Sequence, residues 1–121
     1  METKIIDETI DENGFTEAEL ARIERTDTAI VVSLTEPITF KPSKLDDERT
    51  LDRLTLPRTV KGKHLKAMDQ AQGEMGKTLA LIAALARVPV RAADDLNAAD
   101  IDLVMKVVEP FLPKPRATGR F

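Results

Sequence analysis

Residues 97–112 (NAADIDLVMKVVEPFL) would form a helix with more apolar surface than one small core needs, and this limits the folds open to the chain. The apolar stripe of such a helix consists of Ile101, Val104, Met105, Val108, Phe111 and Leu112. Leu103 and Val107 fall outside this stripe and widen the apolar arc to roughly 200° of the circumference. Two explanations remain open. Internal packing covers the whole arc, or part of the arc contacts a partner or a second copy of the chain.

The residue types that carry chemistry are scarce in this chain. Because it has no cysteine, it cannot form disulfides, thiol nucleophiles or cysteine–metal sites. Its one histidine, His64, is surrounded by lysines, so we expect an exposed histidine and not a base or a metal ligand. No set of nucleophile, base and orienting residue can be assembled from the rest. We therefore expect a protein that is not an enzyme and that takes no cofactor or metal.

Hydropathy and length indicate one small domain away from membranes. A chain of 121 residues suits a single domain with tails. The longest apolar run, Leu79–Ala86, falls well short of the roughly 20 residues that cross a bilayer. No apolar stretch follows a basic start, so we expect no secretory signal and no membrane partner.

Charge is distributed unevenly along the chain. Residues 1–27 are mostly acidic, and we interpret them as a flexible arm with a short helix over 17–25, capped by Thr16 and Glu19. A basic patch follows at Arg58, Lys61, Lys63 and Lys66, with Arg53 as a further candidate, and residues 113–121 form a basic tail that we expect to be disordered. Such a patch leaves open a small DNA- or RNA-binding regulator, although no aromatic residues interleave for base stacking.

The pattern between the tails predicts an α+β domain over residues 28–112. Alternating β-branched residues predict a strand over 28–35, extended at a sheet edge by 38–40 after Pro37, and an antiparallel partner over 50–56. Three main helices should pack on this β-hairpin, over 59–72 with Thr59 as cap, over 75–87, and over 97–112 with Asn97 as cap.

One local pattern resembles a phosphate-binding loop. Residues 71–78 (AQGEMGKT) end in Gly76-Lys77-Thr78, where a nucleotide site would place Lys77 on the phosphates and Thr78 on magnesium. Such a loop must follow a buried parallel strand, and here it follows a polar stretch. We therefore expect residues 71–78 to be an ordinary turn between helices followed by a helix start.

The order of these elements is similar to the Mu-like phage tail assembly chaperone family. The resemblance lies in Val31–Ile38, Leu54–Thr59, Leu81–Leu96 and Asn97–Leu112 and covers about residues 28–112. It implies a protein of the host bacterial cytoplasm that binds the tail tape-measure protein, keeps it soluble and helps to recruit tail tube subunits. Two features depart from the family pattern: a long connection over 41–49 and the acidic extension 1–27.

Surplus apolar surface gives the candidates for partner contact. We predict contact through Leu79, Leu81, Leu85, Leu103, Val107 and Phe111. These residues come from the helical pattern and not from the family. A self-associating phage structural subunit would use the same faces, so it remains an alternative to the chaperone.

Overall fold

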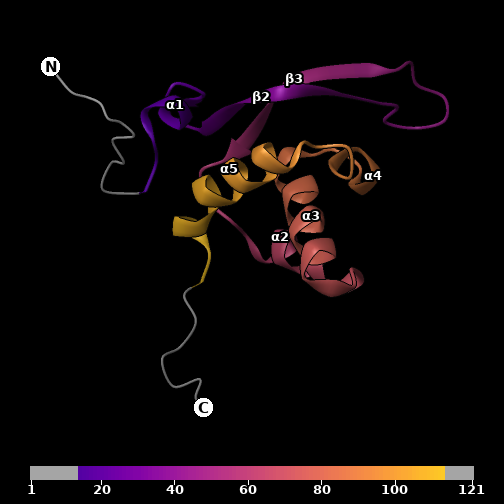
Figure 1. The fold of residues 1–121 in the computed structure, drawn as a ribbon. Helices are drawn as coiled ribbons and strands as arrows, with labels where there is room; N and C mark the ends of the chain where they lie inside the picture. Colours follow the sequence, from indigo (N-terminus) through magenta and orange to yellow (C-terminus); the bar gives the residue numbers. More distant parts are fainter. Residues whose placement is uncertain (1–13, 114–121) are drawn as a thin grey trace, which may run out of the picture.

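The computed structural model describes residues 14–113 and has the predicted α+β class (Figure 1). Its elements in chain order are α1 (Glu17–Leu20), β1 (Ile23–Arg25), β2 (Ala29–Phe40), β3 (Arg49–Pro57), α2 (Gly62–Lys66), the 3-10 helix η2 (Ala67–Gln70), α3 (Gly73–Ala86), α4 (Val90–Ala93), α5 (Ala98–Val108) and the 3-10 helix η3 (Glu109–Phe111). The strands form an antiparallel sheet in the order β1-β2-β3, and helices α3 and α5 lie on the same side of it.

The predicted hairpin is confirmed, and its first strand, β2, runs unbroken through Pro37. β2 is the central strand of the sheet at residues 30–32, but its residues 38–40 pair with β3 alone, so they lie at an edge as predicted. The pairing with β3 jumps from Ser33–Arg53 to Ile38–Leu51, and Pro37 lies in this bulge. β1 pairs only with residues 30–32 of β2. Pro37 is therefore tolerated because no ladder needs the N–H that it lacks.

A buried carboxylate ties this bulge to the last helix. Asp100, in the first turn of α5, is fully buried and accepts hydrogen bonds from the backbone N–H and the hydroxyl of Thr35, both 3.0 Å from Oδ2. Arg22, just before β1, forms an ion pair with the same carboxylate. One side chain thus satisfies a backbone donor that the bulge would leave without a partner.

The N-terminal segment belongs to the sheet more than we expected. The Thr16–Glu19 capping box is confirmed, but helix α1 ends at Leu20, and the predicted helix over 17–25 is wrong beyond that point. Strand β1 follows and pairs with β2, while Phe15 is 2% exposed within the core. The sheet therefore begins inside the segment that we interpreted as an arm. Residues 1–13 of the predicted arm and residues 114–121 of the predicted tail 113–121 lie outside the described residues.

The two long helices were predicted well, and the helix after the hairpin was not. α3 and α5 are present, and the Asn97 side chain accepts from Ala99 N at 2.9 Å as the predicted cap. Thr59 caps nothing. The helix expected over 59–72 is two short pieces, α2 and η2, that begin at Gly62. Its thin apolar face explains why this segment follows the local packing instead of one regular helix.

The wide apolar arc of α5 is explained by internal packing. Leu103, Val104, Val107 and Val108 are all buried, whereas Ile101 is only partly so. Placing Leu103 and Val107 outside the core face was therefore wrong. The helix contacts both β2 and α3, so it needs apolar side chains on more than one narrow stripe. Within residues 14–113, no helix is long and apolar enough to cross a membrane.

Candidate interaction surface

The structure buries most of the side chains that we predicted for partner contact. Leu81, Leu85, Leu103 and Val107 are at most 3% exposed, so a partner could reach them only if the core opened. Leu79 and Phe111 are partly buried and pack against the core from its margin. Most of the apolar surface that exceeded one narrow stripe in the sequence belongs to the core, because both long helices contact more than one neighbouring element.

Exposed apolar side chains occur elsewhere, and one lies on α3. The large hydrophobic residues with the most exposed area are Leu45 (97%), Met75 (58%) and Val90 (49%). Met75 lies one helical turn before Leu79 on α3, a spacing that places both on one face. No residue of α3 before Ala80 is buried. The first two turns of α3 therefore carry an apolar strip made of Met75, which is exposed, and Leu79, which is partly exposed.

The phosphate-loop pattern falls within this same helix. Gly73 begins α3, and Gly76, Lys77 and Thr78 lie inside it. The element before it is the 3-10 helix η2 and not a strand. As we predicted, residues 71–78 are a turn and a helix start, and no strand-to-helix loop is present to hold phosphate.

Strand β3 has an open edge. Among residues 14–113 it pairs with β2 alone. Ser33 N donates to Arg22 O at 2.8 Å, so the backbone of Ser33 faces β1 and that of its neighbour Val32 faces β3. Val32 is opposite Leu54, which places the backbone N–H groups of Arg53 and Thr55 on the outer side. These donors are available for another strand to pair with.

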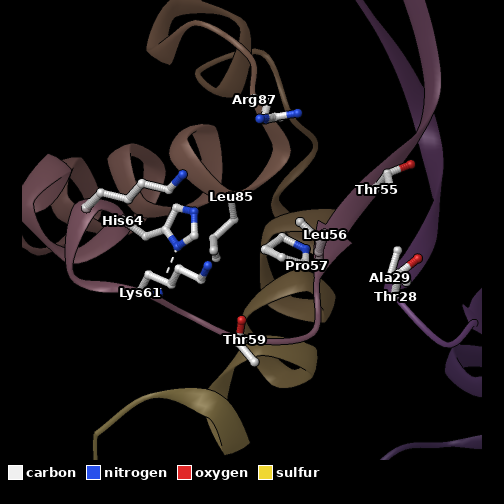
Figure 2. A pocket seen from close by; sticks show the side chains of 11 residues that line it. Thr28, Ala29, Thr55, Leu56, Pro57, Thr59, Lys61, His64, Leu85 and Arg87 are labelled. Carbon is white, nitrogen blue, oxygen red and sulfur yellow. Dashed lines mark hydrogen bonds between the residues drawn. The ribbon is translucent and has the colours of Figure 1, made fainter.

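Two hollows flank this edge and share Thr55 and Arg87. The first has a volume of about 310 Å³, and its lining comprises Thr28, Ala29, Thr55, Leu56, Pro57, Thr59, Lys61, Lys63, His64, Leu85 and Arg87. The second, of about 260 Å³, is lined by Phe40, Arg49, Leu51, Arg53, Leu54, Thr55, Ala86, Arg87 and Val88. Figure 2 shows the first hollow, with His64 and Leu85 between Arg87 on one side and Lys61 and Thr59 on the other.

The charged residues that line the two hollows are all basic. The cations that line the two hollows are Arg49, Arg53, Lys61, Lys63 and Arg87, and no aspartate or glutamate lines either. Arg53 has an exposed contact with Asp52 at 3.4 Å, which is too weak to neutralise it. We call this margin of β3, with both hollows, the basic edge.

Part of the basic edge was predicted from the sequence. Lys61, Lys63 and Arg53 belong to the predicted patch, while Arg58 instead donates to the carbonyl of Thr26 at 2.7 Å. Arg87 was missed, because it lies far along the chain at the end of α3. It takes a left-handed conformation there, with φ of 62°, which ends the helix and places it between the hollows. This position was hard to predict from the sequence, because glycine usually occupies the left-handed position at a helix end.

His64 is buried and neutral, so the expectation of an exposed histidine was wrong. Its Nδ1 accepts a hydrogen bond from the backbone N–H of Lys61 at 2.9 Å, and the residue is 9% exposed. Burial lowers the pKa of His64, and the charges of Lys63, Lys61 and Arg87 lower it further. The residue therefore fixes the start of α2 beside the first hollow.

Comparisons with known proteins identify no relative. The chain matches no family model, no curated protein and no solved structure. Within the described range, no group of histidine, cysteine, aspartate and glutamate side chains is arranged to hold a metal ion.

Proposed function

We propose that this protein is a non-enzymatic tail assembly chaperone of a phage or prophage, acting in the host bacterial cytoplasm. Its client is the tape-measure protein, which it keeps soluble until tail tube subunits polymerise around it. The order of elements carries the proposal. A hairpin, a helix followed by a proline turn and an asparagine-capped helix support it by their order, whereas the helix after β3 begins at Gly62 and not at the threonine that the resemblance implies.

The apolar strip on α3 supplies the contact in this proposal. Met75 is exposed at the start of α3, and Leu79, one turn further along, is partly exposed at the margin of the core, so an apolar helix of the client can pack against both. A client with exposed apolar helices aggregates unless such surface is covered. Of the six residues predicted for contact, Leu79 is the one that this surface includes.

Co-expression with the long helical protein encoded by the neighbouring gene tests the proposal. The chain should raise the soluble yield of that protein several-fold and co-purify with it. Met75→Lys should remove the effect because it places a charge within the apolar contact. Leu45→Lys is the matched control, since Leu45 is 97% exposed on the β2–β3 turn, and this variant should keep the effect. An unchanged yield with no recovered complex would contradict the proposal.

A DNA- or RNA-binding regulator is the second candidate, and the positive charge of the basic edge favours it. Phosphate contacts would make binding depend strongly on salt. A mobility shift at low salt that Arg87→Glu abolishes would favour the regulator over the chaperone. No shift at low salt would exclude it.

A further inference from the structure

We propose that the basic edge binds residues 1–13 of a second copy of this chain, which add a fourth strand beside β3. This inference goes beyond the chaperone function and does not depend on it. It starts from the open edge, where Arg53 and Thr55 direct their backbone N–H groups outward while β2 occupies the other side. An extended segment can take up these donors by strand addition.

The sequence of residues 1–13 (METKIIDETIDEN) matches this edge in charge and in strand-forming character. It carries five acidic residues, Glu2, Asp7, Glu8, Asp11 and Glu12, against a single lysine. The basic edge presents five cations and no lining acid. Complementary charge of this kind speeds the encounter of two surfaces and favours the matching partner over others. The segment also contains three isoleucines and two threonines, residues that favour strands.

The apolar floor of the second hollow suits the isoleucines. Leu51 and Phe40 line it from the sheet, and Ala86 and Val88 line it from the end of α3. Ile6 and Ile10 would fall on one face of an added strand and can lie over this floor, while the acidic residues beside them reach the arginines.

The position of Gly14 favours a second copy over the same chain. Its carbonyl accepts from Lys106 Nζ at 3.4 Å, and the chain then passes through α1 into β1. β1 is the opposite edge of the sheet from β3. A segment that starts there would have to cross the sheet before pairing with its own β3. The same segment of another copy can approach β3 directly.

Sedimentation velocity of the purified full chain tests the proposal without any client present. Self-association should increase with protein concentration and weaken as salt rises, because the charges are on the surface. A chain that stays monomeric at every concentration at low salt would overturn the proposal, and this includes the case in which residues 1–13 fold back on their own copy.

Charge-reversal variants locate the contact. The edge variant Arg53→Glu/Arg87→Glu and the segment variant Asp7→Lys/Glu8→Lys should each weaken self-association by about tenfold or more. The control Lys41→Glu/Lys44→Glu makes the same change in charge at the β2–β3 turn, outside both hollows, and should associate like the native chain. An equal loss in the control would contradict the assigned contact. Circular dichroism melts verify that each variant folds.

Mixing the two variants gives the decisive comparison. In the mixture, the segment variant supplies an intact basic edge, and the edge variant supplies an intact acidic segment. The mixture should therefore form a one-to-one pair that neither variant forms alone. Failure to restore association, with both variants folded, would overturn the proposal. Thr55→Pro removes one outward N–H, and it too should weaken association if a strand is added.

Discussion

At the scale of single residues, two buried polar side chains hold the fold together, and each acts through backbone groups. Asp100 accepts a hydrogen bond from the backbone N–H of Thr35 in the bulge of β2, and His64 accepts one from the backbone N–H of Lys61 at the start of α2. Sequence alone gave neither role. The sequence around Asp100 gives no sign of its role, because its partners Thr35 and Arg22 are 65 and 78 residues away.

Replacing Asp100 by Asn should lower the free energy of unfolding by about 3 kcal/mol, since Arg22 loses its counter-charge and the new amide opposes the Thr35 N–H. Urea unfolding measures the change. Asp102→Asn is the control on the same helix, at an exposed position, and should shift stability by less than about 0.5 kcal/mol. Equal effects of the two substitutions would show that the buried carboxylate has no special role.

His64 should make stability depend on pH below neutrality. Its pKa is lowered in the folded chain, so the unfolded chain binds the proton first as pH falls below the ordinary value of about 6.5. The contribution is complete above that value and is lost as pH falls towards the folded pKa. His64→Asn, which retains an acceptor for Lys61 N, should flatten this part of the profile. Because the chain has one histidine, its ring proton gives one NMR titration, and a midpoint at or above 6.5 would contradict the account.

At the scale of elements, periodicity predicted the strands and helices that depend on local sequence. It failed for elements that form only by pairing or packing with a distant segment. The hairpin strands and helices α3 and α5 follow from alternation, helical spacing and the Asn97 cap. Strand β1 was missed because its three residues, Ile23–Arg25, carry no alternation of their own and become a strand by pairing with β2. The basic edge was found only in part for the same reason, since Arg87 comes from another element.

The segment with α1 and β1 should be essential to the fold and not an appendage. Phe15 is 2% exposed in the core, so Phe15→Ala should cost about 3–5 kcal/mol of unfolding free energy. Thermal and urea melts measure it, with the exposed Glu17→Ala as control. A stability close to that of the native chain would mean that residues 15–25 contribute little to the core.

At the scale of the whole molecule, the described residues carry two different surfaces that are at least partly exposed. One is the apolar strip at the start of α3, and the other is the basic edge along β3. The two differ in chemistry, so they suit different partners. In the two proposals above, the α3 strip binds the client and the basic edge binds a second copy of the chain.

Hydrogen exchange of the chain alone and mixed with the tape-measure protein tests the central claim most directly. The account predicts slower exchange at residues 73–79 in the mixture, where Met75 and Leu79 contact the client, and unchanged exchange at the β2–β3 turn over 41–48. Identical exchange at residues 73–79 with and without the tape-measure protein would contradict the claim that this chain protects a client through α3.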